Sequence, residues 1–195
     1  MTNLQLSPHH LIFEGAELTG KSYLISKIYN HFELKYNTGL GLLDGCYWFN
    51  CDVGIFGGSY GLPVINKYIE IAEILKQRNI IYEKFHLTNF VNGKLLNTPI
   101  LNHGDIEKKL KKLNFKIIFL KVDEDEQLFQ NRIQDRLKLY PHYQRILHKP
   151  NWYIQQQRLL LNTLNQSILE HLVVDTTQIP NQVDQEILTW LGELD

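Results

Sequence analysis

The chain has 195 residues, of which 44% are hydrophobic and 21% charged, and its formal net charge is −1. A single domain of this size buries about 70% of the surface that its unfolded chain exposes, so it needs no disulfide or structural metal. The near-neutral charge excludes a global electrostatic attraction to nucleic-acid polymers or anionic membranes. No segment approaches the ~18 apolar residues of a membrane span, and Cys46 and Cys51 lack zinc or redox spacing, so we expect a cytoplasmic protein with structural thiols.

Apolar runs of strand length alternate with segments of helical period along the whole chain. This pattern is typical of an α/β fold, in which helices cover both faces of a mostly parallel sheet. The first predicted elements are a strand at 10–13, a helix at 22–32, a short strand within the glycine-rich and aromatic segment 39–61, a helix from Pro63 to about Arg78 and a strand at 79–82. Proline fits the first turn of that helix, where the backbone N–H has no helical partner.

The second half of the chain continues the alternation. Its predicted elements are a helix at 105–113, a strand at 115–122, helices at 125–139 and 151–170, a strand at 172–174 and a helix at 183–191. Pro141 ends the helix before it, and residues 142–150 are expected to be irregular. No element is assigned between residues 83 and 105. We therefore predict one domain over residues 1–195 with five strands.

Residues 15–22 match the phosphate-binding pattern G-x-x-x-x-G-K-S/T between a predicted strand and a predicted helix. The glycines let the backbone N–H groups converge with the helix N-terminus on the phosphates of a nucleotide. Lys21 would reach the β- and γ-phosphates, and the Ser22 hydroxyl would ligate Mg²⁺. The pattern alone does not separate a kinase from a GTPase or an ATPase switch. The predicted nucleotide-binding residues are Gly15, Ala16, Glu17, Leu18, Thr19, Gly20, Lys21 and Ser22.

Residues 13–22 resemble the F-E-G-x-D/E-x-x-G-K-S/T opening of thymidylate kinases, which belong to the P-loop nucleoside and nucleotide kinases. The resemblance implies a three-layer P-loop fold with a small helical lid. It also implies that the carboxylate of Glu17 faces the phosphate acceptor. A solvated loop carboxylate is the alternative interpretation of Glu17.

Residues 80–86, IIYEKFH, resemble the strand that ends in an acid–base–aromatic motif in these kinases. The resemblance implies that Glu83 lies near the metal and that Lys84 holds the acceptor. Lysine replaces the arginine of the family here, and it offers a point charge instead of a planar fork for a phosphate. Specificity for a nucleoside monophosphate therefore stays open, and exposed charges at a strand end are the alternative.

Residues 119–136 are similar to the strand and helix that lead into the lid of these kinases, here about 132–150. Lid arginines stabilise the transferring group and exclude water. The resemblance makes Arg132 and Arg136 the catalytic candidates, and Arg145 is a weaker candidate. Residues 174–178 weakly resemble the turn that borders the adenine.

Segment 39–61 occupies the position of the acceptor site in these kinases, although its own sequence matches no known motif. Its aromatic residues would either stack on a base or belong to the core. Asp44 and Asp52 would be acceptor-side carboxylates, one with the role of a general base, or caps of turns. The aromatic residues in question are Tyr47, Trp48, Phe49, Phe56 and Tyr60.

The resemblance therefore predicts an ATP- and Mg²⁺-dependent phosphotransferase, similar to nucleoside monophosphate kinases, whose acceptor is a nucleotide or nucleoside. A kinase of a non-nucleotide metabolite and a nucleotide-binding protein without phosphotransfer are the alternatives. Neither a membrane nor a nucleic-acid polymer is expected as a partner, and a homodimer would be consistent with the family. The acceptor and the choice between ATP and GTP stay open.

Overall fold

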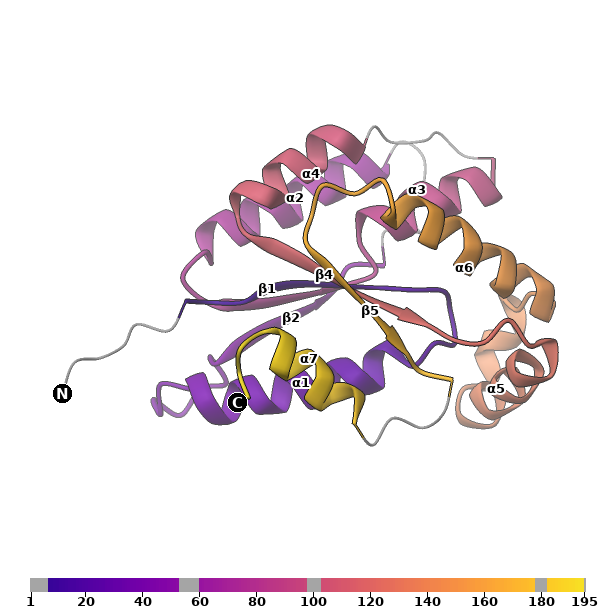
Figure 1. Ribbon diagram of the computed structural model, residues 1–195, viewed down its shortest axis with the longest axis horizontal. Coiled ribbons are helices and arrows are strands. Elements are labelled where there is room, and N and C mark those ends of the chain that lie inside the picture. The colour runs from indigo at the N-terminus through magenta and orange to yellow at the C-terminus, as the bar shows by residue number, and fades with distance from the viewer. Residues whose placement is uncertain (1–6, 53–59, 98–102, 178–181, 195) are drawn as a thin grey trace.

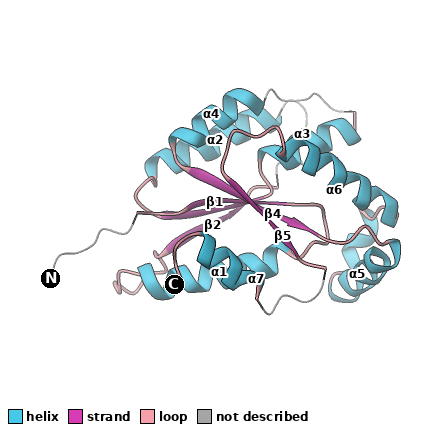
Figure 2. Ribbon diagram, viewed as in Figure 1, coloured by secondary structure: helices cyan, strands magenta, loops and turns pink. Residues whose placement is uncertain are grey.

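A computed structural model describes residues 7–52, 60–97, 103–177 and 182–194. Its centre is a sheet of five parallel strands in the order β2-β3-β1-β4-β5 (Figures 1 and 2). This confirms the predicted α/β class. The strands are β1 (His10–Glu14), β2 (Cys46–Asn50), β3 (Asn79–Glu83), β4 (Phe115–Lys121) and β5 (His171–Asp175).

Helices cover both faces of the sheet, so the molecule has the predicted three layers. One face carries α2 (Gly61–Ile74), α3 (His86–Leu95), α4 (His103–Lys112) and α6 (Pro150–Leu164), and the other carries α1 (Lys21–Tyr36) and α7 (Val183–Trp190) (Figure 1). Helix α5 (Glu126–Leu139) and the 3₁₀ turn η2 (Pro141–Arg145) lie beyond the end at which β4 and β5 finish. Among the described residues, no helix is long and apolar enough to cross a membrane.

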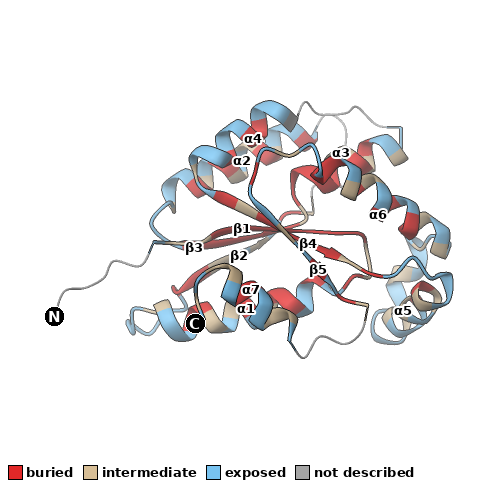
Figure 3. Cartoon of the chain, in the orientation of Figure 1, coloured by how far each residue is buried: buried red, intermediate tan, exposed pale blue. Residues whose placement is uncertain are grey.

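The alternation of side chains along the central strand divides the core into two halves. Leu11 and Phe13 of β1 pack with α1 and α7, whereas Ile12 packs with α2, α3, α4 and α6. All three residues are fully buried, as the sheet is throughout its middle (Figure 3). A strand buried on both faces reads as a continuous apolar run, which is why β1 and β4 were predictable.

Two predictions about elements are wrong. Helix α3 was not predicted, and α6 ends at Leu164 instead of near residue 170. The six residues after α6 form a turn because buried Glu107 accepts hydrogen bonds from the Ser167 hydroxyl and the Ile168 N–H, at 2.7 and 2.9 Å. The expected irregular stretch after Pro141 contains η2, and the other described elements lie within four residues of their predicted bounds.

The strand order determines where a site can form. The chain leaves β1 towards one face of the sheet, and the neighbouring strands β3 and β4 lie on either side of β1. Ligands of open α/β sheets bind outside the carboxyl ends of the strands at such points. The segments that follow β1, β2 and β3 meet at this edge, and they carry the predicted phosphate loop, Asp52 and Lys84.

Candidate active site

The loop between β1 and α1 has the curled backbone that its glycines predict. Gly15 has φ +141°, and a Cβ there would lie 2.5 Å from the carbonyl oxygen of Leu120, so only glycine fits. Gly20 has φ +85° and forms the N-cap of α1 in the left-handed conformation. The Thr19 hydroxyl donates to the Ala16 carbonyl at 2.9 Å and closes the loop. The N–H groups of the first turn of α1 have no acceptor within the helix, which suits this helix end to binding an anion.

Lys21 is buried, and its ammonium lies along this loop. Its Nζ donates to the carbonyl oxygens of Gly15 at 2.8 Å and Ala16 at 2.6 Å. Burial lowers the pKa of Lys21, and the nearby carboxylate of Glu17 opposes that effect. The ammonium is therefore held at the loop, where it can pass from carbonyl oxygens to phosphate oxygens as a point charge.

Ser22 and Glu83 form the group that fits a metal ion. The Ser22 hydroxyl donates to Glu83 Oε1 at 2.7 Å, and Glu83 Oε2 is buried with no hydrogen-bond partner in the described part of the chain. An unpaired carboxylate oxygen beside a hydroxyl suits Mg²⁺, which takes oxygen ligands. No group of three or more His, Cys, Asp or Glu residues within the described ranges could hold a metal alone. The remaining ligands would be phosphate oxygens and water.

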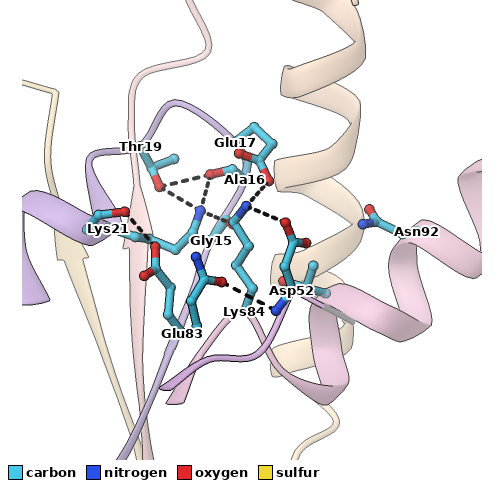
Figure 4. A network of polar contacts seen from close by, with 12 residues as sticks. Gly15, Ala16, Glu17, Thr19, Lys21, Asp52, Glu83, Lys84 and Asn92 are labelled. Carbon is cyan, nitrogen blue, oxygen red and sulfur yellow. Dashed lines mark hydrogen bonds and ion pairs between the residues drawn. The ribbon is translucent and has the colours of Figure 1, made fainter. Parts of the chain in front are cut away.

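Lys84 is the central cation of a charged cluster beside the loop. Its Nζ lies 2.9 Å from Glu17 Oε1 and 3.5 Å from Asp52 Oδ2, so three separate loops contribute to one cluster (Figure 4). Lys84 has φ +57°, a strained value for a residue other than glycine, and such strain is typical of functional sites.

Opposite charges keep the Lys84 ammonium and the Glu17 carboxylate in their charged forms. Burial would lower the pKa of Lys84, but Glu17 and Asp52 outweigh it and raise the pKa above its usual value. Burial would raise the pKa of Glu17, and the ammonium groups of Lys84 and Lys21 hold that pKa below its usual value.

These groups face one cavity of about 520 Å³. Its walls include the phosphate loop from residue 17 to 22, together with Asn50, Asp52 and Lys84, and the lid side contributes Arg136 and Tyr143. A cavity of this size accommodates small ligands and cofactors. Thr176, in the turn predicted to border a nucleotide base, also lines it.

Neither a protein-family model nor a curated protein matches the sequence. Solved structures do match: the YorR protein from Bacillus subtilis, solved in complex with phosphorylated GDP, has TM-score 0.65 and 18% identity over 93% of this chain and 95% of its own. The deoxyadenosine kinase from M. mycoides, solved with dCMP and dCDP, has TM-score 0.54 and 14% identity over 95% and 100%. The chain has the P-loop nucleoside and nucleotide kinase-like fold. This confirms the expected fold and does not single out thymidylate kinases.

The kinase-like fold places the three candidate lid arginines differently. Arg132 donates to the backbone carbonyls of Leu18 at 2.7 Å and Thr176 at 2.6 Å, so it ties α5 to the phosphate loop and the turn after β5. Arg136 lines the cavity with its guanidinium 4.7 Å from the centre of the Tyr143 ring. Arg145 is exposed on η2 and does not line the cavity.

The described residues of segment 39–61 contribute Asn50 and Asp52 to the cavity wall. Phe49 packs against the core, Trp48 packs on Tyr29 of α1, and Tyr60 is exposed. Tyr47 lies in β2, and Phe56 lies outside the described residues. The described aromatic residues therefore belong to the core and surface, not to a stacking platform.

The two aspartates of this segment lie at opposite ends of the sheet. Asp44 precedes β2 and accepts hydrogen bonds from the Thr38 N–H and hydroxyl, at 2.9 and 2.7 Å, so it caps a loop. Asp52 follows β2 and lines the cavity. Of these two aspartates, Asp52 alone lines the cavity.

Two buried side chains that bond the backbone of the loops around the cavity were not predicted. Buried Gln156 on α6 accepts the Glu17 N–H at 2.9 Å and donates to Asn92 on α3 at 2.9 Å. Glu14 is fully buried, and its Oε1 accepts the N–H groups of Phe85 and Leu87 at 3.0 and 3.1 Å. The glutamate inside an apolar strand was a signal for a buried role of Glu14, whereas a helical glutamine carries no comparable signal.

Proposed function

We propose that this protein is a kinase that transfers the γ-phosphoryl group of ATP to a nucleoside or nucleotide. One observation carries the proposal: Lys21 and Ser22, which would hold the phosphate donor, line the same cavity as Lys84, which would hold the acceptor. A nucleotide switch needs only the first set, since it binds no second substrate. The likeness to the YorR protein, solved with phosphorylated GDP, and to a deoxyadenosine kinase supports the same conclusion.

Each group of cavity residues would have its own role in the transfer. The loop N–H groups and Lys21 would hold the β- and γ-phosphates, while Glu17 and Lys84 orient the acceptor in line with the γ-phosphorus. Mg²⁺ held through Ser22 and Glu83 would neutralise charge that develops on the phosphates. Arg136 would add positive charge and exclude water as the lid closes. The protein needs no covalent intermediate for this reaction.

The two cysteines bear on the cellular compartment in which the enzyme would work. Cys46 and Cys51 are free and buried, and burial raises the pKa of both above its usual value, so neither is poised for redox chemistry. This supports a reducing, cytoplasmic location for the enzyme. A homodimer, as the resemblance implied, is part of this proposal and is tested by the mass of the protein in solution.

The proposal is tested by ADP release from Mg-ATP in the presence of nucleosides, nucleoside monophosphates and unrelated hydroxylated metabolites. We expect one nucleotide-class acceptor to stimulate ADP release, and Lys21→Ala to abolish it. Lys27→Ala, an exposed lysine on the same helix, is the matched control and should leave turnover unchanged. Stimulation only by a non-nucleotide metabolite would reassign the acceptor, and ATP binding without any stimulation would leave a binding protein.

A further inference from the structure

The charges around Lys84 are not balanced. One ammonium lies within 2.9 and 3.5 Å of two carboxylates, Glu17 and Asp52, so this part of the cavity carries one positive and two negative charges. An ammonium has three N–H donors. Glu17 at 2.9 Å engages one of them and Asp52 lies farther away at 3.5 Å, so Lys84 can still donate to an oxygen of the acceptor.

The other charges of the cavity wall bring the count to neutrality and no further. The described wall carries four cationic side chains and four carboxylates, so it has no surplus positive charge for an acceptor phosphate: Lys21, Lys84, Arg132 and Arg136 against Glu17, Asp52, Glu83 and Asp135. Lys21 is held by carbonyls of the phosphate loop, and Arg132 is held by the carbonyls of Leu18, Thr176 and Thr177. The internal segments outside the described residues, 53–59, 98–102 and 178–181, contain no Lys, Arg or His. Arg136 is the remaining basic residue of the cavity wall, and Asp135 and Glu83 line the same wall.

We propose that the acceptor is uncharged where it meets Lys84, which makes it a nucleoside hydroxyl and not a nucleoside monophosphate. This inference rests on the proposed kinase function. A phosphate monoester would bring a charge of about −1.5 to −2 beside Glu17 and Asp52. Like charges placed together oppose binding, whereas a hydroxyl can accept from Lys84 and donate to a carboxylate at no such cost.

The proposed phosphoryl transfer needs no reactant beyond ATP, the acceptor and these residues. The acceptor hydroxyl oxygen attacks the γ-phosphorus, and a new P–O bond forms. The bond between the γ-phosphorus and the β,γ-bridging oxygen breaks, and its electron pair leaves with ADP. The hydroxyl proton passes to the carboxylate of Asp52, so the products are ADP and a nucleoside monophosphate.

The first experiment compares nucleosides with their own 5′-monophosphates: thymidine with dTMP, deoxycytidine with dCMP, deoxyadenosine with dAMP and deoxyguanosine with dGMP. We expect kcat/KM for at least one nucleoside to exceed that of its monophosphate by roughly tenfold or more, as one additional like charge predicts. The base is constant within each pair, so the ratio reports the accepting group and not the preference for a base.

The second experiment changes the charge of the site. Glu17→Gln should shift the nucleoside-to-monophosphate ratio by roughly tenfold towards the monophosphate, because Glu17 contributes charge and takes no proton in the transfer step. Asp52 is left intact in this comparison, since only a nucleoside hydroxyl needs it as a base. Glu70→Gln is the matched control, because Glu70 is exposed on α2, pairs with Lys67 and does not line the cavity. Its ratio should equal that of the wild type.

The outcomes separate this inference from the function on which it rests. Turnover of a monophosphate with an inert nucleoside would leave the kinase function intact and overturn the neutral acceptor. No turnover of any pair, with Mg-ATP bound, would overturn both. If a variant does not fold, as thermal unfolding would reveal, the wild-type comparison still decides.

Discussion

Arg132 and Arg136 lie one helical turn apart on α5, yet they contact different partners. Arg132 donates to the carbonyls of Leu18, Thr176 and Thr177, whereas Arg136 faces the cavity beside Tyr143. The resemblance suggested both as catalytic groups. Sequence cannot separate them, because the direction of each side chain depends on how α5 packs against the rest of the molecule.

We expect Arg132→Ala to lower the free energy of unfolding by about 2 kcal/mol, since three carbonyls lose a charged donor. It should also raise KM for ATP, because Leu18 of the phosphate loop, with φ +68°, loses its anchor. Arg136→Ala should change stability by less than ~0.5 kcal/mol and lower kcat at least about tenfold. Urea titration and steady-state kinetics measure both. A drop in kcat with unchanged stability and KM in Arg132→Ala would make Arg132 a catalytic residue.

Glu83 allows a residue-scale test of the metal. Its Oε2 is buried without a partner, and Oε1 accepts from Ser22. Glu83→Gln replaces a carboxylate oxygen with an amide and should raise the Mg²⁺ concentration needed for half-maximal turnover by about tenfold. Glu70→Gln, on an exposed pair with Lys67, is the control. An unchanged Mg²⁺ requirement in Glu83→Gln would remove Glu83 from the metal site.

At the scale of elements, local motifs predicted most of the architecture, and α3 shows why they did not predict all of it. Its sequence, HLTNFVNGKL, has an internal glycine and buries polar Thr88 and Asn89, so it has no clear apolar face. Its N-cap residue Phe85 provides no side-chain cap. The cap comes from Glu14, more than seventy residues earlier, so no local pattern could reveal the start of this helix.

Glu14 therefore determines whether α3 forms. Its Oε1 accepts the N–H groups of Phe85, Leu87 and Thr88, and Oε2 accepts the Thr88 hydroxyl. We expect Glu14→Ala to lower the free energy of unfolding by about 3 kcal/mol and to speed hydrogen exchange at residues 85–88. Thr88→Val removes one of these bonds and should cost about 1 kcal/mol. Equal costs for the two variants would contradict the capping role.

At the scale of the whole molecule, the alternating pattern predicted the layers, but the order of the strands and the pairing of distant residues depend on packing. The phosphate loop and Lys84 come together only because β3 pairs with β1. Gln156 reaches Glu17 only because α6 packs on α3. These contacts join residues with no local relation, so sequence motifs could suggest the candidate groups of the cavity but not the buried residues that position its loops.

Glu193 joins both ends of the chain. Its side chain is 3% exposed and accepts hydrogen bonds from four groups near the N-terminus and on α1. The four donors are His9 Nε2 at 2.8 Å, His31 Nε2 at 3.0 Å, Lys35 Nζ at 2.9 Å and Tyr36 Oη at 2.5 Å. Burial would raise the pKa of Glu193, but these donors outweigh it and lower the pKa to about 2.

The sign of the pH dependence follows from this shift. A carboxyl group whose pKa is lower in the folded state stabilises the fold above its unfolded value of 4.5, and the contribution is lost as pH falls towards about 2. We expect Glu193→Gln to be about 2 kcal/mol less stable than wild type at pH 7, after allowance for solvent around Lys35 and His31. The difference should narrow between pH 4.5 and 2 in urea titrations. Glu170→Gln, on an exposed pair with Lys116, should stay within ~0.5 kcal/mol of wild type throughout. A difference for Glu193→Gln that does not change with pH would mean that the carboxylate charge does not hold the two ends together.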